Sequence, residues 1–385
     1  GVNHVIIGNI VGEIDGDIDS CSNASDIEVH FDSYQKLGGI VGSILAPGVT
    51  ILLDSISYCS NTGKIVSKSQ SPYQSSEVGG IAGSASAFIF HSRNAGSIAI
   101  DYGYAGGISG SGKHAHYCEN TGSISGGRYA GGIFGLGAGI RWCTNKGHVD
   151  GSYAGGIIGD GGSVYFSVNE GDVRGTYVGG ISGLNADVIS QSINRGQLEG
   201  GTVGGICGEN VRNIYSSYSY TNKVNAKDVV GGIVGINSGY VWTSAYDSTL
   251  LPSVSLLGVE KSDSKVVESF ALSTKQMQSA EFADKLNEAM RDDGKTRMEY
   301  DDSKYPRLTW SFDGGYPIFG DSLHLPVYRI DLDDSVFVSY ALTDDKGHIV
   351  DLPPAYSTKG RYFEGWVDST GKSVSKSTVV NGPAT

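Results

Sequence analysis

The sequence predicts a mainly β fold: a right-handed parallel β-helix, or solenoid, of about nine coils, with a small α/β cap and a C-terminal β-grasp-like module. Two observations predict the solenoid. The phrase G-G-I-x-G recurs with a period near 25 residues, and short β-like runs without helical periodicity separate its copies before residue 260. Glycine supports it, because 58 of 385 residues are glycine without the triplet period of collagen. The right-handed sense is expected by analogy with other β-helices.

Two phrases alternate along residues 1–250. The second has the form small-x-N-x-G-x-apolar and places asparagines at Asn61, Asn94, Asn120, Asn145, Asn169 and Asn194. The first begins at Gly38, Gly79, Gly106, Gly131, Gly155, Gly179, Gly204 and Gly231, with a degenerate G-N-I-V-G copy at Gly8. Equivalent positions of stacked coils lie about 4.8 Å apart, so each phrase predicts columns of like side chains.

The glycines are expected at turns that require φ > 0. The asparagines are expected to hydrogen-bond to one another along a turn.

Three apolar columns are expected to fill the core. The first apolar column is Ile40, Ile81, Ile108, Ile133, Ile157, Ile181, Ile206 and Ile233. The second is Ile56, Ile89, Ile140, Val164 and Ile189, and the third is Ile65, Ile98, Ile124, Val149, Val173 and Leu198.

The cysteines share one repeat position that is serine in other coils. Such a position accepts only small side chains, which indicates tight packing. Stacked coils hold Cβ atoms further apart than disulfides prefer, so free buried thiols are expected at Cys21, Cys59, Cys118 and Cys143. The cysteines do not show the C-x-x-C spacing of a metal-binding site. Cys207 occupies a variable position and is not expected to be catalytic.

Composition excludes several classes of function. The net charge is −13, and the Lys and Arg clusters that bind phosphates are missing, so nucleic acid is not an expected partner. No run approaches 18 apolar residues, so membrane insertion is not expected. The chain starts at Gly1 without Met or a leader, so we expect a fragment whose signal peptide was removed or lies upstream.

No catalytic residue, metal or cofactor is predicted. The acidic run "GEIDGDIDS", with Asp15, Asp17 and Asp19, lacks the glycine and distal glutamate of a calcium loop and is expected to form solvated turns. His114 and His116 are expected to be surface histidines rather than metal ligands. Neither H-E-x-x-H nor G-x-S-x-G occurs.

Two aromatic columns are the candidate glycan-binding site. The first aromatic column stands three residues before each asparagine and holds Tyr58, Tyr117, Trp142 and Phe166, with His91 and Gln191 at the same place. The tyrosine column stands two before each glycine pair and holds Tyr104, Tyr129, Tyr153 and Tyr177, with Lys36 and Glu77 at the same place. Both are expected to face outward. For the tyrosine column this requires the glycine pair to break strand alternation.

Aligned aromatic faces on a rigid surface bind sugar rings. The alternative is that the rings only stack on one another and stabilise neighbouring coils. The candidate ligand-binding residues are therefore Tyr104, Tyr129, Tyr153, Tyr177, Tyr117, Trp142 and Phe166.

The order G-G-I-x-G followed by C-x-N-x-G-x-V resembles the GLUG motif repeat, over residues 1–250 and about nine copies. GLUG units occur in large extracellular bacterial proteins, including adhesins, surface proteins and non-catalytic regions of secreted peptidases. The resemblance implies an extracellular or cell-surface location and no catalytic residues.

Residues 251–325 are predicted to form an α/β capping segment. One helix is expected over Ala271–Met290, with Ser273 as N-cap and Gln276 completing a capping box. Its apolar stripe would be Met277, Phe282, Leu286 and Met290. Such a segment resembles the one that often closes a GLUG array, and it would cover edge strands that otherwise pair with other chains.

Residues 326–385 begin with the alternating runs "VYRIDL" and "VFVSYAL". The pattern K-G-x-x-F-x-G-W, carried by Gly360, Phe363, Gly365 and Trp366, is similar to the Listeria–Bacteroides repeat of the internalin B type. That resemblance implies a β-grasp-like spacer or adhesive module. The family's last strand would follow "VVNGPAT", where the chain stops, so a truncated module is expected.

These observations predict a non-catalytic, monomeric extracellular bacterial surface protein with a structural and adhesive role, which presents or binds glycans or host or microbial surface proteins. Two alternatives stay open. The chain is the carrier region of a secreted carbohydrate-active enzyme or peptidase, or the β-helix itself cleaves polysaccharide with a carboxylate pair within about 10 Å.

Overall fold

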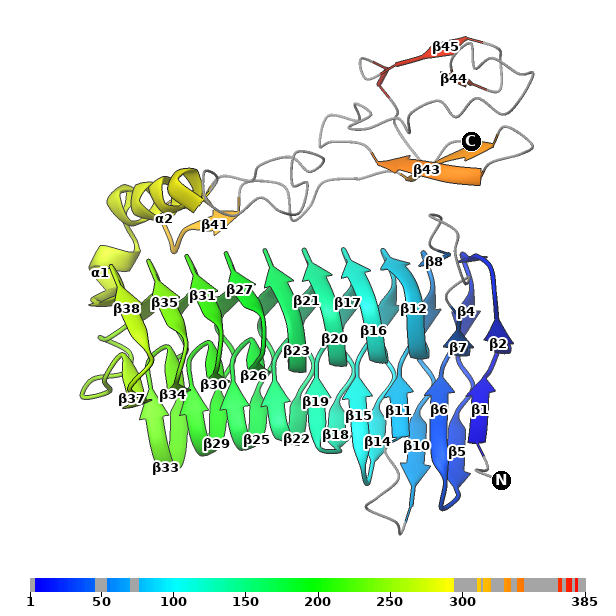
Figure 1. Cartoon of the computed structure of the whole chain (residues 1–385), viewed down its shortest axis with the longest axis horizontal. Coiled ribbons are helices and arrows are strands. Elements are labelled where there is room, and N and C mark those ends of the chain that lie inside the picture. The colour runs from blue at the N-terminus through cyan, green and yellow to red at the C-terminus, as the bar shows by residue number, and fades with distance from the viewer. Residues whose placement is uncertain are drawn as a thin grey trace. The chain divides into compact units, whose positions relative to one another are not determined.

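The computed structural model describes residues 4–45, 54–69, 76–293, 310–312, 314–319, 329–333, 338–342, 366–368, 372–375 and 378–379. The chain divides into two compact units, Gly1–Met277 and Gln278–Thr385. The first unit is a parallel β-solenoid of about eight turns, in which strands of successive coils lie side by side (Figure 1). The predicted mainly β solenoid is confirmed, with about eight turns for the nine coils expected.

Three parallel sheets build the solenoid, and neighbouring coils pair in register, as where Ile98 lies opposite Ile124. The first sheet comprises β1 (His4–Gly8), β5 (Ile27–His30), β6 (Tyr34–Gly38), β10 (Ile65–Lys68), β11 (Ser76–Gly79), β14 (Ile98–Ile100), β15 (Gly103–Gly106), β18 (Ile124–Gly126), β19 (Tyr129–Gly131), β22 (Val149–Gly155), β25 (Val173–Gly179), β29 (Leu198–Gly204) and β33 (Val224–Gly231). From β22 onward one strand replaces the two shorter strands of each earlier coil.

The second sheet comprises β2 (Val11–Ile14), β3 (Ile18–Asp19), β7 (Val41–Ile44), β8 (Ser55–Ser57), β12 (Ala82–Phe90), β16 (Ser109–His116), β20 (Phe134–Arg141), β23 (Ile158–Tyr165), β26 (Ser182–Asn185), β27 (Val188–Ser190), β30 (Cys207–Asn210), β31 (Asn213–Tyr215), β34 (Val234–Asn237), β35 (Tyr240–Trp242), β37 (Leu257–Glu260) and β38 (Lys265–Val267). The third comprises β4 (Ser22–Asn23), β9 (Ser60–Asn61), β13 (Arg93–Asn94), β17 (Glu119–Asn120), β21 (Thr144–Asn145), β24 (Val168–Asn169), β28 (Ile193–Asn194), β32 (Tyr218–Ser219), β36 (Ala245–Asp247) and β39 (Phe270–Leu272). All three sheets thus start before residue 30, and the second and third continue past residue 250.

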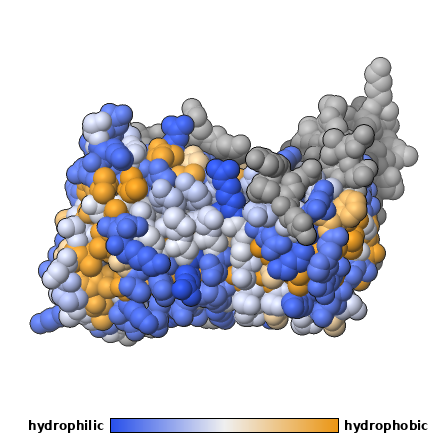
Figure 2. All heavy atoms as spheres, turned by 90° about the horizontal axis from the view of Figure 1, so that it is seen from below, coloured by the Kyte–Doolittle hydropathy of each residue, from blue (hydrophilic) through white to orange (hydrophobic). Residues whose placement is uncertain are grey.

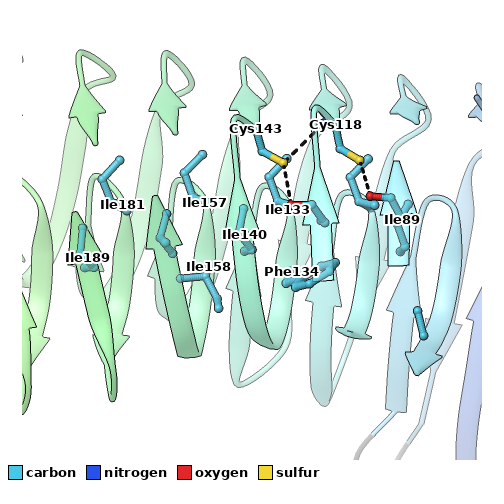
Figure 3. Packing of buried hydrophobic residues seen from close by; sticks show 14 of the residues in the cluster. Ile89, Cys118, Ile133, Phe134, Ile140, Cys143, Ile157, Ile158, Ile181 and Ile189 are labelled. Carbon is cyan, nitrogen blue, oxygen red and sulfur yellow. Dashed lines mark hydrogen bonds between the residues drawn. The ribbon is translucent and has the colours of Figure 1, made fainter. Parts of the chain in front are cut away.

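Two separate clusters of buried apolar side chains run along the solenoid. One contains the first two predicted columns, and Ile133, Ile157 and Ile181 repeat from coil to coil in Figure 3. The other contains the third predicted column. The three predicted columns are confirmed. A fourth, which the sequence did not indicate, joins the second cluster: Leu37, Val78, Ala105, Ala130, Ala154, Val178 and Val203.

The glycine pair breaks strand alternation, as predicted. Ala105 and Ile108 are both fully buried, whereas Tyr104 is half-buried. Strict alternation would place Ala105 and Ile108 on opposite faces of a strand. The intervening Gly106 and Gly107 therefore let both side chains point inward and leave the tyrosine outside.

The repeated glycines serve close packing, and the prediction that they take φ > 0 is wrong. Described glycines with positive φ all lie outside the G-G-I-x-G phrase. A Cβ on Gly106 would lie 1.9 Å from the carbonyl oxygen of Ser109, and one on Gly110 would lie 2.2 Å from the amide nitrogen of Val78. The first and third glycines therefore form a glycine seam, where strands of the first and second sheets meet backbone to backbone.

The second glycine of each pair lies against an asparagine. A Cβ on Gly132 would lie 2.2 Å from Cγ of Asn145 and 2.2 Å from the carbonyl oxygen of Gly156. The same contact joins Gly107 to Asn120. The two repeated phrases are therefore complementary, because one supplies the space that the other fills.

The asparagines form a continuous hydrogen-bonded ladder. Nδ2 of Asn145 donates to Oδ1 of Asn169 and to the carbonyl of Gly147, at 2.9 Å each. Its Oδ1 accepts Nδ2 of Asn120 at 2.8 Å and the N–H of Gly147 at 3.2 Å. Every polar atom of this fully buried amide is thereby paired, so the asparagines are structural, as expected.

Different residues complete the ladder at its two ends. In the first coil the second glycine of the pair is replaced by Asn9, which donates to Oδ1 of Asn23 at 3.1 Å. At the other end Nδ2 of Asn194 donates to Oγ of Ser219 at 3.2 Å. Tyr246 fills the next position, where it is 2% exposed.

A second, shorter asparagine ladder lies on the second sheet. Asn185 donates to Asn210, and Asn210 donates to Asn237, at 2.7 Å each. The two repeated phrases do not predict this ladder, because its three members appear only in the later coils and outside those phrases.

The cysteines are free, and the predicted burial is confirmed for Cys59, Cys118 and Cys143 but is wrong for the half-buried Cys21. Those four cysteines share a column with serines, whose hydroxyl groups accept backbone N–H groups from the preceding coil. Oγ of Ser92 accepts the N–H of Cys59 at 3.2 Å, and Sγ of Cys143 accepts the N–H of Cys118 at 3.4 Å (Figure 3). Burial raises the pKa of Cys59 to about 12, which keeps this thiol protonated and unreactive.

Two helices replace the single helix predicted. α1 (Thr274–Met277) follows β39, and its capping box is confirmed by the bonds between Ser273 and Gln276, at 2.8 to 3.4 Å. α2 (Ala280–Asp293) begins after Ser279, whose Oγ accepts the N–H of Phe282 at 3.2 Å. The predicted stripe residues Met277, Phe282 and Leu286 are buried, and the side chain of Met290 lies outside the described residues.

The second unit contains α2 and three antiparallel strand pairs among its described residues. They are β40 (Trp310–Ser311) with β41 (Ile318–Phe319), β42 (Arg329–Asp333) with β43 (Val338–Leu342), and β44 (Trp366–Val367) with β45 (Ser373–Val374). Asn287 of α2 bonds both backbone groups of Trp310, at 2.7 and 3.0 Å. Gly360, Phe363 and Gly365 lie outside the described residues, so the β-grasp module stays a prediction.

Asn145→Ala is expected to lower the free energy of unfolding by about 3 kcal/mol or more. The substitution leaves Nδ2 of Asn120, Oδ1 of Asn169 and both backbone groups of Gly147 without these partners in a buried site. Urea titration followed by circular dichroism measures the loss. The matched control, Asn225→Ala on an exposed residue, should stay within about 0.5 kcal/mol of the parent.

Gly107→Ala is expected to cost about 3 kcal/mol or to prevent folding, because its Cβ would lie 2.1 Å from the carbonyl oxygen of Gly132. Gly12→Ala is the control, since the nearest atom to its added Cβ is 3.7 Å away. Thermal melts of both variants test this. Equal melting temperatures for the two would contradict the close-packing role of the pair.

Candidate functional site

The first aromatic column occupies left-handed backbone in every coil. Tyr58, His91, Tyr117, Trp142 and Phe166 have φ between 46° and 57°, as do their equivalents Ser20 and Gln191. This conformation costs a non-glycine residue of the order of 1 kcal/mol. The positive φ that we predicted for glycine is therefore carried by these residues, at the corner between the second and third sheets.

Hydrogen bonds hold this corner in each coil. The N–H of Tyr117 donates to the carbonyl of Arg141 in the next coil at 3.1 Å. The N–H of the following residue, Cys118, donates to the side chain of Cys143, which stands in the serine and cysteine column. The side chain of the small residue after each ring thus accepts a backbone N–H that would otherwise need a carbonyl oxygen. This role explains why only serine and cysteine occupy that position.

The rings of this column stack face to face. Ring centroids are 5.0 Å apart for Tyr58 and His91, 5.0 Å for His91 and Tyr117, 4.9 Å for Tyr117 and Trp142, and 5.6 Å for Trp142 and Phe166, with interplanar angles of 4° to 9°. Trp142 is only 4% exposed, so its expected outward exposure is wrong. Because each inner ring has a neighbour on both faces, this column is suited to stabilising the coils.

Two histidines beside this column are less exposed than expected. His116 is 2% exposed and meets Phe90 and Trp142 edge to face, so the prediction of a surface histidine is wrong for it. His114 is half-buried and stacks on Phe88 at 4.4 Å. Burial lowers the pKa of His114 to about 4, and nearby Arg141 and Lys113 add to the effect.

No member of the tyrosine column is buried, whereas the first aromatic column contains the buried Trp142 beside the half-buried Tyr58, Tyr117 and Phe166. Tyr104, Tyr129, Tyr153 and Tyr177 are all half-buried, and successive ring centroids lie 5.6, 5.3 and 4.6 Å apart. The guanidinium of Arg128 lies 5.1 Å from the ring centroid of Tyr129. Stacking covers the inner ring faces, so this column can offer ring edges and hydroxyl groups to a ligand.

Carboxylates of the second sheet reach this column across the glycine seam. Burial raises the pKa of Asp160, on β23, and the nearby phenol of Tyr129 counteracts part of this shift. Burial also raises the pKa of Tyr153, and the charge of Glu209, on β30, adds to this shift. The sequence pattern does not group either carboxylate with the tyrosines, because they lie on different sheets.

The acidic run that was expected to form solvated turns makes hydrogen bonds to a neighbouring coil. Oδ1 of Asp17 accepts the N–H and the hydroxyl of Ser55, at 2.7 Å each. Burial raises the pKa of Asp54, and the charges of Asp15 and Asp17 reinforce the shift. Within the described ranges, no group of three or more His, Cys, Asp or Glu residues could hold a metal ion.

Exposed apolar side chains concentrate in the terminal coils. In Figure 2 hydrophobic residues gather toward both ends of the face shown, with hydrophilic residues between them. The large exposed ones include Ile10, Phe31 and Leu45 in the first coils and Val211, Tyr240 and Trp242 in the last. No helix among the described residues is long and apolar enough to cross a membrane.

Comparison with known proteins does not extend this description. No protein-family model, curated protein or solved structure matches the chain.

His91→Tyr is expected to reduce the loss of stability on acidification. Burial lowers the pKa of His91 to about 4, with Arg93 adding to the effect. The unfolded chain, with a histidine pKa of about 6.5, therefore binds the proton first as pH falls, so stability is lost between about pH 6.5 and 4. Tyrosine preserves the stack with Tyr58 and Tyr117 without this titration.

The expected difference between parent and variant across that range is on the order of 2 kcal/mol. Urea titrations at pH 7 and pH 4.5 measure it. His148→Tyr, on an exposed histidine, is the control and should keep the parental pH dependence. An unchanged slope for His91→Tyr would argue against a neutral, buried imidazole.

Proposed function

We propose that the chain is a non-catalytic, extracellular bacterial surface protein with a structural and adhesive role. The tyrosine column carries this proposal. Its four half-buried rings are held by the parallel register of β15, β19, β22 and β25. Because folding has already fixed these side chains, binding a ligand costs little additional conformational entropy of the protein.

The resemblance to the GLUG repeat supports the extracellular location. It rests on the two repeated phrases, which fit together where the second glycine of each pair lies against an asparagine of the ladder. Surface proteins hold binding groups at fixed distances from a cell. A continuous solenoid suits that role, because each coil contacts its neighbours through three sheets.

The alternative is the carrier region of a secreted carbohydrate-active enzyme or peptidase. The same continuous sheets favour it, because a rigid spacer serves a catalytic domain equally well. The sequence of the whole gene product separates the two proposals: further tandem repeats and a wall anchor support the adhesive role, and a catalytic motif in another domain supports the carrier role.

The adhesive role is tested by binding the 385-residue chain to a broad glycan array and to immobilised bacterial and host cells. The double variant Tyr129→Ser/Tyr153→Ser should lose at least about tenfold in affinity, equivalent to about 1.4 kcal/mol. The control Tyr102→Ser/Tyr240→Ser removes two exposed tyrosines outside both columns and should bind like the parent.

Equal binding by both double variants would remove the tyrosine column from the site. No binding to any glycan or cell would contradict the adhesive role and favour the carrier role. Release of reducing ends from a bound glycan would instead assign the chain to the polysaccharide-cleaving β-helices.

A further inference from the structure

A column of side chains on the second sheet lies across the glycine seam from the tyrosine column. Its members are partners in register on successive coils, and all are half-buried. We call it the facing column: Leu136, Asp160, Leu184, Glu209 and Ile236.

The seam fixes how close the two columns lie. A Cβ on Gly159 would be 2.9 Å from the carbonyl carbon of Tyr129, and one on Gly183 would be 2.7 Å from that of Tyr153. Each of these glycines directly precedes a member of the facing column, Asp160 or Leu184. The backbones therefore touch, and the side chains on either side of the seam border one strip of surface.

The facing column alternates between apolar and acidic residues from coil to coil. Like side chains therefore recur every second coil, which is about 9.6 Å at the spacing of neighbouring strands. The tyrosine column instead supplies one phenol per coil from Tyr104 to Tyr177. The strip thus has a two-coil repeat over the five coils from Leu136 to Ile236, and the same register continues with Ser111 before it and Val259 after it.

An extended polysaccharide has a matching chemistry. In a β-1,4-linked chain with a two-fold twist, every second sugar presents the same face and the same edge, so its contacts with a flat surface repeat every two sugars. Each sugar carries C–H groups on its faces and hydroxyl groups along its edges. Leucine and isoleucine side chains pack against C–H faces, and carboxylates accept hydrogen bonds from hydroxyl groups. The carboxylates also repel uronate or sialate groups, which selects uncharged sugars.

We propose, on the basis of the adhesive role above, that the strip between the tyrosine column and the facing column binds a neutral, extended β-linked glycan parallel to the solenoid axis. Asp160 and Glu209 accept hydroxyl groups two coils apart, and Leu184 packs against the sugar between them. Across the seam, Tyr129 borders Asp160 and Tyr177 borders Glu209, and these phenols offer hydroxyl groups to the same glycan.

The test measures binding of cellohexaose, a neutral β-1,4-linked hexasaccharide, to the 385-residue chain by isothermal titration calorimetry at pH 7. A β-1,4-linked hexamannuronate is the anionic comparison. Asp160→Asn and Glu209→Gln should each weaken cellohexaose binding roughly tenfold, the loss expected for one hydrogen bond to a charged group.

The matched controls are Asp150→Asn and Glu199→Gln, which remove the same charges from half-buried residues of the first sheet outside the strip. They should change the dissociation constant less than about twofold. Thermal melts of all four variants show whether any loss of binding comes from unfolding. The proposal is supported when cellohexaose binds more tightly than hexamannuronate and only the strip variants lose affinity.

Four outcomes overturn the proposal. Cellohexaose binding that survives both strip variants, or a preference for hexamannuronate, rejects this site and ligand class and leaves the adhesive role standing. No cellohexaose binding by a chain that still binds cells or other glycans on the array does the same. A chain that binds neither cellohexaose, array nor cells rejects the adhesive role as well.

Discussion

The fit between the asparagine ladder and the second glycine of each G-G-I-x-G phrase is the constraint on which the solenoid depends. The amide of Asn145 is fully buried and has partners on both adjacent coils and on its own backbone. It reaches that position only because Gly132 has no Cβ. A change to either residue therefore disturbs hydrogen bonds in more than one coil, which is why the two phrases repeat together.

The corner before each asparagine shows how strain is distributed along the solenoid. A positive φ at a tyrosine or tryptophan costs free energy in every coil. Stacking of each ring on its neighbours, together with the side-chain acceptor supplied by serine or cysteine, offsets that cost. Local strain is thus balanced by contacts between coils, and such contacts exist only once neighbouring coils have formed.

The same stacking decides which aromatic residues can meet a ligand. The rings of the first aromatic column cover one another, and Trp142 is buried among them. The four residues of the tyrosine column are all half-buried, and Asp160 and Glu209 lie close to them. Two columns that look alike as sequence patterns therefore differ in the surface that they offer.

The sequence by itself determined the solenoid, its three apolar columns, the asparagine ladder and the free cysteines, because a residue repeated once per coil must stack on its own copies. It also indicated that the glycine pair breaks alternation, since Tyr104 and its equivalents share their position with Lys36 and Glu77. It did not determine which residues take positive φ. The glycines and the aromatic residues both recur once per coil, so the repeat alone does not show which of the two positions has left-handed backbone.

Only the tertiary structure decided contacts between different sheets. How each coil bends at its glycines decides the closeness of Asp160 to Tyr129, the burial of His116 and the seam between the first and second sheets. The repeat period does not predict that bend. The order of side chains along the axis follows from sequence, whereas their grouping around the coil follows from packing.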